Sequence, residues 1–325
     1  MADYKTKRRI VMIWAYLMHL GRLMWGDFGP GDGGKCIITD EWTFDDKVWH
    51  SISQRLHDQG RCNMIVMDIG EGVEYESHPE IKAPGSWSKK QLAAEISRLR
   101  ALGFEVIPKL NFSTGHDKWM GIYSRMISTP QYYQFCTDVI DEMCELFGNP
   151  SLFHLGMDEE CFAIQKKNPL CIIRQHDLYW HDINFLIKAV EKNGARPWLW
   201  ADYIWHVPEN EKDFVENMSR DALLSNWYYG DWEEDYFDEA RRGYVALEKH
   251  GFEQVPTGGN CDRTREYTEE NMVLTVDRCT KIIAPERLKG FMMTPWEMTT
   301  EIMLPRHEAA VDRLTEAHDY YYKRG

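Results

Sequence analysis

The sequence predicts a single (β/α)8 barrel that spans residues 1–325. Apolar, strand-like runs alternate with segments of helical periodicity along most of the chain. No linker-like stretch divides the chain, and acids and aromatics recur just after the strand-like runs, where barrel enzymes carry their sites. An open doubly wound sheet is the alternative, but no dinucleotide-binding fingerprint follows the first strand.

Eight runs are expected to form the strands, and they are 10–18, 62–68, 104–110, 152–157, 196–202, 222–227, 252–256 and 289–296. The seventh has the weakest pattern. The first follows a basic stretch and mimics a signal peptide, but it lacks a small-residue cleavage site and is too short to span a membrane. We therefore expect a core strand and a cytoplasmic protein, or a periplasmic or secreted one if a signal has been removed.

Helical spacing is found in six intervening segments, 88–102, 131–147, 177–192, 232–250, 269–283 and 308–322. In the first of them Leu92, Ile96 and Leu99 fall on one face, and Gly103 provides a stop signal. These segments are the expected outer helices of the barrel.

Composition narrows the partners and the chemistry. The formal net charge of -14 argues against nucleic acid or an anionic membrane as a partner. The 13 Trp and 16 Tyr exceed what a core needs, and sugar-binding clefts use aromatic rings as stacking surfaces. The eight cysteines include no C-x-x-C pair and no His-x-His pair occurs, so we expect free thiols, no metal and no cofactor. The oligomeric state is left open.

The most informative stretch is 153–160, a short apolar run followed by Asp158, Glu159 and Glu160. Acids are costly to bury, and a barrel strand can deliver them to a pocket at its carboxyl end. In a regular strand Asp158 and Glu159 would point to opposite faces, so both can line one pocket only where the strand bends into a loop. The competing interpretation is a helix N-terminus, where acids complement the dipole.

The other strand ends carry acids, polar groups and aromatics: Arg22, Asp68, Glu71, Asn111, His116, Trp200, Asp202, Trp227, Tyr228, Trp296 and Glu297. Glycoside hydrolysis needs a general acid at the leaving oxygen, anionic support for an oxocarbenium-like centre, and stacking surfaces. The set therefore favours a glycosidase that binds a carbohydrate.

The segment 154–159 resembles the H-x-G-(G/A/M)-D-E motif of glycoside hydrolase family 20, the β-N-acetylhexosaminidases. Segments 107–116, 224–228 and 296–297 are similar to that family's later motifs and follow in the same order. The resemblance implies exo-acting, retaining hydrolysis in which the 2-acetamido oxygen of the substrate is the nucleophile.

The resemblance also implies the roles of individual residues. Glu159 would be the general acid and base, Asp158 would orient the acetamido group, and Tyr228 would donate a hydrogen bond to its oxygen. Adjacent acids also raise each other's pKa, which suits an acid that must hold its proton. The implied substrate-binding residues are Arg22, Asp68, His116, His154, Trp200, Asp202, Trp227, Trp296 and Glu297.

The departures from the family pattern fall mainly on sugar recognition. Lys109 replaces a family Glu, Ser113 and Thr114 interrupt the "P-G-H" segment, and Gly230 stands where an Asp is usual. Two alternatives therefore stay open, namely a glycosidase of the same fold with another sugar specificity, and a carbohydrate-binding relative without turnover. If the substrate does not assist, Glu160 or Glu297 would be the nucleophile of an ordinary two-carboxylate mechanism.

Overall fold

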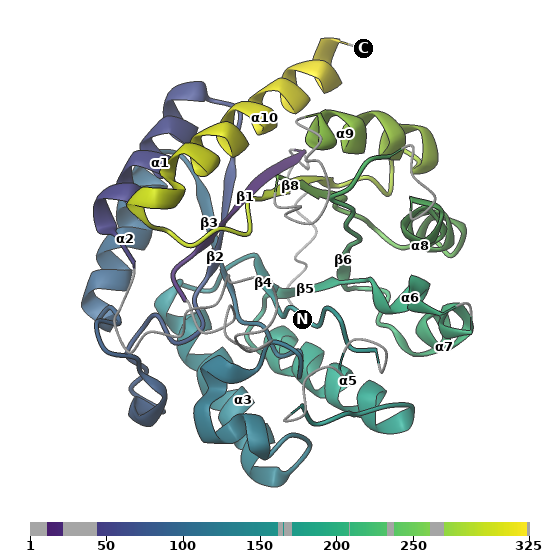
Figure 1. Cartoon of the computed structure of the whole chain (residues 1–325). Coiled ribbons are helices and arrows are strands. Elements are labelled where there is room, and N and C mark those ends of the chain that lie inside the picture. The colour runs from purple at the N-terminus through teal and green to yellow at the C-terminus, as the bar shows by residue number, and fades with distance from the viewer. Residues whose placement is uncertain are drawn as a thin grey trace, which may run out of the picture.

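The computed structural model describes residues 12–21, 44–161, 165, 171–207, 209–232, 237–260 and 270–323. In these residues a parallel sheet has the strand order β6-β5-β4-β3-β2-β1-β8-β7. Bridges from Leu224 to Gln254 and from Trp227 to Thr257 join its two edges. Helices surround the closed sheet (Figure 1). The predicted (β/α)8 barrel is confirmed.

The strands are β1 (Ile13–His19), β2 (Met64–Asp68), β3 (Glu105–Lys109), β4 (Leu152–His154), β5 (Arg196–Trp200), β6 (Leu223–Ser225), β7 (Thr257–Gly259) and β8 (Gly290–Thr294). Seven of them fall inside or overlap the predicted runs. The predicted position of the seventh strand is wrong, because 252–256 forms only isolated bridges and β7 follows it.

Two glycines explain the error in β7. Gly258 and Gly259 lack the side chains that usually signal a strand. A Cβ on Gly259 would collide with the carbonyl oxygen of Thr294, and one on Gly258 would lie 2.9 Å from Thr275 Oγ1. The close packing against β8 and α9 that requires glycine therefore removes the signal for the strand.

Side-chain alternation builds the barrel interior. The inward apolar residues form one cluster: Ala15, Leu17, Met64, Val66, Ile107, Leu152, Trp198, Trp200, Leu223, Val255 and Met292. Outward residues pack beneath the helices in a second cluster. One register step beyond the apolar positions, toward the carboxyl ends, His19, Asp68, Lys109 and His154 pair in sequence across β1 to β4. These polar positions form the floor of the candidate site.

The α-helices are α1 (Asp46–Gln59), α2 (Lys89–Ala101), α3 (Pro130–Leu146), α5 (Asp177–Lys192), α6 (Tyr203–His206), α7 (Asn210–Asn217), α8 (Phe237–Lys249), α9 (Asn271–Ile282) and α10 (Leu304–Lys323). Short 3-10 helices are η2 (Pro79–Ile81), η3 (Lys118–Arg125) and η4 (Glu301–Met303). All six predicted helical segments are found, whereas α1, α6 and α7 were not predicted. No helix in the described ranges combines the length and apolar character that crossing a bilayer requires.

Helix α1 had sequence signals that pattern reading missed. Asp45 accepts hydrogen bonds from the backbone N–H groups of Lys47 and Val48, and Gly60 ends the helix with φ 64°. Trp49 and Ile52 lie on its buried face.

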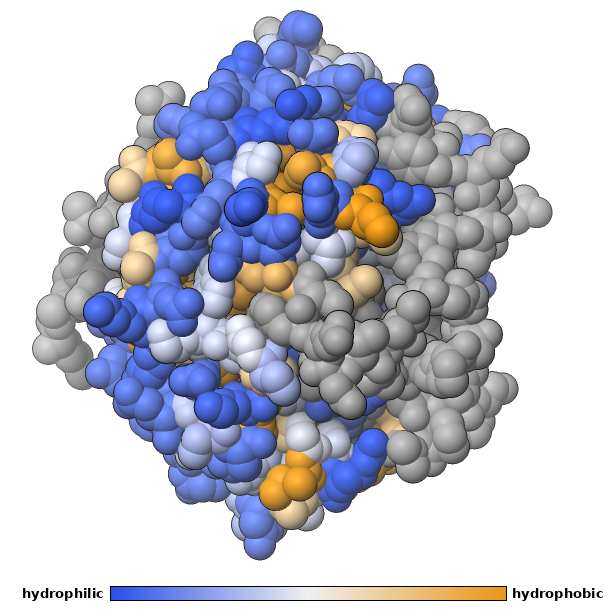
Figure 2. Space-filling view, turned by 60° about the vertical axis from the view of Figure 1, so that its left-hand side comes forward, coloured by the Kyte–Doolittle hydropathy of each residue, from blue (hydrophilic) through white to orange (hydrophobic). Residues whose placement is uncertain are grey.

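On the described part of the surface in Figure 2, apolar residues form small patches among hydrophilic ones.

Candidate active site

The turn after β4 brings the two predicted catalytic acids together. Met157 (φ 74°) and Glu159 (φ 58°) adopt left-handed backbone conformations, which are rare for residues other than glycine. His116 Nε2 lies 3.4 Å from both Asp158 Oδ2 and Glu159 Oε2. A Cβ on Gly156 would collide with Asn111, so the glycine allows β3 and β4 to approach at this point. The regular alternation of the strand is broken, and both acids face one histidine.

The two acids differ in environment. Asp158 is buried, and Asn111 Nδ2 donates a hydrogen bond to its Oδ1 over 2.8 Å. Burial raises the pKa of Asp158, the charges of Asp202 and Glu159 add to the increase, and those of His116 and Lys109 oppose it. The Glu159 side chain is 25% exposed. Asp158 is therefore the more buried of the two acids, and Glu159 is the more exposed one.

Asp202 supports the backbone of Glu159. Its Oδ2 accepts hydrogen bonds from Glu159 N at 2.8 Å and from His206 Nε2 at 2.7 Å. Although burial disfavours the imidazolium, hydrogen bonding to Asp202 raises the pKa of His206 to about 10. Asp202, predicted to bind substrate, has no exposed surface and instead fixes the left-handed conformation of Glu159.

A buried charged group lies at the ends of β1, β2 and β3. Lys109 Nζ donates to Asp68 Oδ2 over 2.7 Å, and His19 Nδ1 lies 3.1 Å from the same oxygen. Burial acts to raise the pKa of Asp68, but the Lys109 ammonium and His19 hold that pKa well below its usual range. The Lys109 side chain is fully buried, with its ammonium 5.8 Å from the ring centroid of Trp296. The predicted binding residue Asp68 is thus engaged in an ion pair.

Breaking this pair has a predicted cost. Lys109→Met leaves Asp68 charged in a buried site, so we expect a loss of about 3–5 kcal/mol in the free energy of unfolding. Urea unfolding measures the change. The matched control is Lys109→Met combined with Asp68→Asn, which removes both charges and should recover a large part of the loss. Equal destabilisation of the single and double variants would contradict a coupled pair.

An aromatic wall (Trp200, Trp227, Tyr229 and Trp296) lies at the ends of β5, β6 and β8. Trp227 and Tyr229 stack with ring centroids 5.3 Å apart and an interplanar angle of 9°. Trp296 lies 6.0 Å from Trp200 and 6.4 Å from Tyr229. Trp200 is buried, whereas the other three are partly exposed.

Tyr228, predicted to touch the acetamido group, does not lie with these residues. Its hydroxyl donates to the backbone oxygen of Asp231 over 2.6 Å, and its ring meets Trp232 edge-on at 5.4 Å. Residues 227, 228 and 229 alternate in direction as they leave β6, so Tyr229 shares the side of Trp227. Sequence reasoning missed Tyr229, although this alternation could have indicated it.

Three further predicted residues have structural partners. Glu297 is fully buried and accepts a hydrogen bond from Arg306. His154 is also fully buried and its Nδ1 accepts from Gly156 N over 3.0 Å, with burial lowering the pKa of His154 well below its ordinary value. Glu160 is buried in an ion pair with Arg174. Neither Glu160 nor Glu297 is accessible as a nucleophile in this structure.

Two other predictions are not resolved by the geometry. Arg22 lies outside the described residues. Among the residues that are described, no group of three or more His, Cys, Asp or Glu side chains is arranged to hold a metal ion. That no metal or cofactor is needed stays a prediction.

Solved glycoside hydrolases share this fold. No protein-family model matches the sequence. A family 20 chitobiase from Flavobacterium johnsoniae matches with a TM-score of 0.60 and 19% identity, over 84% of this chain and 48% of that chain. A family 20 exo-β-N-acetylglucosaminidase from Vibrio harveyi matches with a TM-score of 0.63 and 13% identity, over 97% of this chain and 57% of that chain. A family 5 glycoside hydrolase from Prevotella bryantii matches with a TM-score of 0.57 and 12% identity, over 94% of this chain and 96% of that chain.

The likeness establishes the class of fold. The chain is a (β/α)8 barrel of the kind found in glycoside hydrolases, and family 20 enzymes are among its structural neighbours. It spans about half the length of the two family 20 proteins. At these identities the fold is common to families 20 and 5, so the choice between reactions depends on the acid turn.

Proposed function

We propose that this chain is a retaining glycoside hydrolase that cleaves β-linked N-acetylhexosaminides with assistance from the substrate's 2-acetamido group. The observation that carries the proposal is the acid turn, in which a buried Asp158 and a partly exposed Glu159 share one histidine. The H-x-G-M-D-E motif of this turn and the family 20 enzymes among the structural neighbours agree with it.

In the proposed first step the acetamido oxygen attacks the anomeric carbon while the glycosidic C–O bond breaks. Glu159 gives its proton to the departing oxygen. In the second step Glu159 accepts a proton from water, and that water attacks the anomeric carbon and opens the oxazolinium ring. Two inversions at one carbon give net retention.

Asp158 is suited to the charge that develops in this reaction. Its carboxylate can accept the acetamido N–H and lie beside the positive oxazolinium ring. Burial disfavours the Asp158 carboxylate in the free protein, as the raised pKa reflects. A cationic intermediate would offset that penalty, so Asp158 would interact more strongly with the intermediate than with the ground state.

The aromatic wall supports a carbohydrate ligand. Trp227, Tyr229 and Trp296 are partly exposed, and pyranose faces and acetamido methyl groups are apolar enough to pack on aromatic rings. The Tyr228 hydroxyl donates to the backbone oxygen of Asp231, and the Tyr229 hydroxyl accepts from Thr294 Oγ1 over 3.2 Å. In this proposal the hydroxyl that donates to the acetamido oxygen belongs to Tyr229, because its ring lies with Trp227 in the aromatic wall.

A second candidate is the same reaction type on a different sugar. Asp68 and Glu297 are engaged by Lys109 and Arg306, so neither is free to bind sugar hydroxyls in the way the sequence resemblance implies. This observation favours a sugar specificity unlike that of the family 20 enzymes, with the acid turn unchanged.

A panel of 4-nitrophenyl glycosides tests the proposal, with release of nitrophenol as the readout. We expect turnover of β-N-acetylglucosaminide or β-N-acetylgalactosaminide, and very poor turnover of the matching glucoside and galactoside, which lack the nucleophile. Good turnover of the 2-hydroxyl substrates would indicate a protein nucleophile. Absence of turnover on every glycoside, with sugar binding retained, would leave the carbohydrate-binding alternative.

A further inference from the structure

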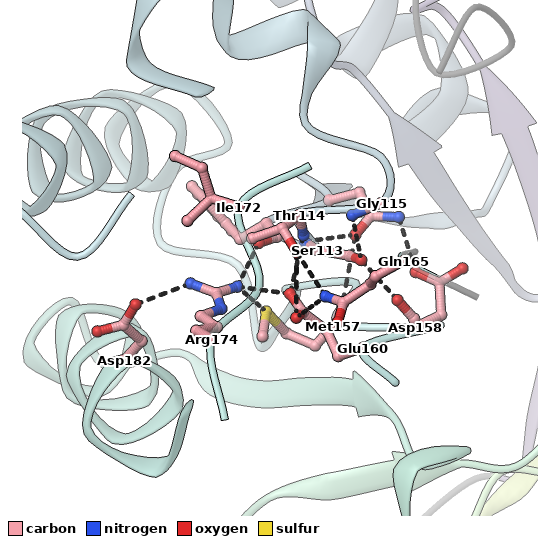
Figure 3. A network of polar contacts seen from close by, with 12 residues as sticks. Ser113, Thr114, Gly115, Met157, Asp158, Glu160, Gln165, Ile172, Arg174 and Asp182 are labelled. Atoms are coloured by element: carbon pink, nitrogen blue, oxygen red, sulfur yellow. Dashed lines mark hydrogen bonds and ion pairs between the residues drawn. The ribbon is translucent and has the colours of Figure 1, made fainter. Parts of the chain in front are cut away.

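Glu160, the third acid of the run, is directed toward Arg174 (Figure 3). Its side chain has no exposed surface, and four groups donate hydrogen bonds to it (Figure 3). Thr114 donates from its N over 2.8 Å and from its Oγ1 over 3.2 Å, Gln165 Nε2 over 2.7 Å, and Arg174 Nη2 over 2.8 Å. A carboxylate so fully engaged is part of the structure that holds the neighbouring residues.

Arg174 is the cation of this network. Its guanidinium is fully buried between Glu160 and Asp182 of α5, with Nη1 2.9 Å from Asp182 Oδ2 (Figure 3). Nη2 also donates to the backbone oxygen of Phe112 over 2.7 Å and lies 3.6 Å from Met157 Sδ. One side chain thus contacts the loop after β3, the turn after β4 and helix α5.

The same two loops are joined at Asp158. Ser113 Oγ donates to the backbone oxygen of Asp158, and Asn111 Oδ1 accepts from Met157 N over 3.2 Å. Ser113 and Thr114 are the residues that interrupt the family-like "P-G-H" segment, and both bind the acid turn. The residues that depart from the family-like segment therefore attach the loop after β3 to the acid turn.

The turn needs such an attachment. Left-handed backbone at Met157 and Glu159 is unfavourable for these residues and persists only where the surroundings determine it. Asp202 accepts a hydrogen bond from the backbone N–H of Glu159. On the other side of Glu159, the Glu160 side chain anchors the backbone through its ion pair with Arg174. Without the Arg174 charge, Glu160 would be a buried carboxylate with neutral donors only, which is unfavourable. The Glu160 side chain would then be expected to move toward water, and that movement would shift the backbone of the turn.

We propose that Arg174 is a positioning residue that acts through Glu160 to hold the Asp158–Glu159 turn in its left-handed conformation. As a statement about catalysis this rests on the proposed function, because the group that is positioned is the general acid Glu159. As a statement about conformation it stands independently.

Glu160→Gln tests the proposal, because it is isosteric and removes the charge that pairs with Arg174. We expect kcat to fall about 10- to 100-fold with KM within about twofold, since small misplacements of a catalytic group have effects of this size. The loss should be larger on glycosides with poor leaving groups, which depend most on protonation by Glu159. Backbone amide exchange in peptides covering 155–161 should become about tenfold faster.

Glu142→Gln is the matched control. Glu142 is also a buried carboxylate, with N–H donors from Glu76 and Ser77, the Ser77 hydroxyl, and Lys89 at 3.5 Å, but it lies on α3. The Glu142→Gln substitution should lower the melting temperature. It should leave both the leaving-group dependence of kcat and the amide exchange of residues 155–161 unchanged. Arg174→Lys is the second test variant, since it keeps the charge but cannot contact all the acceptors at once, and it should show smaller effects of the same kind.

Two results would overturn the proposal. One is a Glu160→Gln protein whose kinetics and amide exchange match those of Glu142→Gln. The other, if Glu160→Gln does not fold, is an Arg174→Lys protein with wild-type exchange in 155–161. If the wild-type protein turns over no glycoside, the proposed function fails, and the exchange rates still decide whether Arg174 and Glu160 hold the turn.

Discussion

Glu159→Gln is expected to lower kcat by about 10²- to 10⁴-fold, the usual contribution of a general acid. The amide keeps the size of the side chain but cannot give a proton to the leaving oxygen. Only the side chain changes, so the hydrogen bond from Glu159 N to Asp202 should survive and the fold should stay intact. Steady-state kinetics on a series of aryl glycosides with leaving groups of different pKa measures the effect.

The leaving-group series identifies the role of the residue. Activated phenolates leave without protonation, so the variant should retain most of its rate on them and lose most on poor leaving groups. Circular dichroism and the melting temperature provide the control for folding. Equal losses across the series would assign Glu159 a role other than general acid.

Asp158→Asn is expected to lower kcat by about 10²- to 10³-fold on N-acetylhexosaminides, because an amide cannot supply the charge that stabilises the oxazolinium ring. The hydrogen bond from Asn111 to Oδ1 can be kept by the amide oxygen, so the geometry should be preserved. A stable thiazoline analogue of the intermediate should bind the wild-type protein much more tightly than the reaction product does. The Asp158→Asn variant should lose most of its affinity for the thiazoline. Calorimetric titration measures both.

Asp213→Asn on α7 is the control for this substitution. Asp213 also accepts from neutral donors, Trp180 Nε1 at 2.7 Å and Tyr203 OH at 3.0 Å, but it lies away from the acid turn. Thiazoline affinity should be unchanged in that variant. If Asp158→Asn binds the thiazoline as tightly as the wild-type protein does, the acetamido group is not the partner of Asp158.

Local patterns in the sequence were enough to predict the barrel and the position of Asp158 and Glu159 at the end of the fourth strand. Alternation and helical periodicity are properties of neighbouring residues, and the motif at Asp158 and Glu159 is contiguous. The same local patterns failed at β7, where close packing demanded Gly258 and Gly259, and at α1, whose caps at Asp45 and Gly60 were not used.

What could not be predicted depends on contacts between distant residues. Asp68 meets Lys109 and Glu160 meets Arg174 only once the barrel has formed, so a sequence cannot distinguish an acid that binds a ligand from one that pairs with a buried cation. Tyr228 and Tyr229 are chemically identical in the sequence, and only the direction of each side chain separates them. The order of residues therefore indicated where the acid turn lies but not the partners of the buried acids.

The division of the site between the two halves of the barrel has a consequence for sugar specificity. The acids and the loops that hold them come from β3 and β4, whereas the aromatic wall comes from β5, β6 and β8. Asp202, at the end of β5, is a direct hydrogen-bonded link between the halves. If the proposed function holds, substitutions at Trp227 and Tyr229 would change the sugar that is bound without touching the residues that position Glu159.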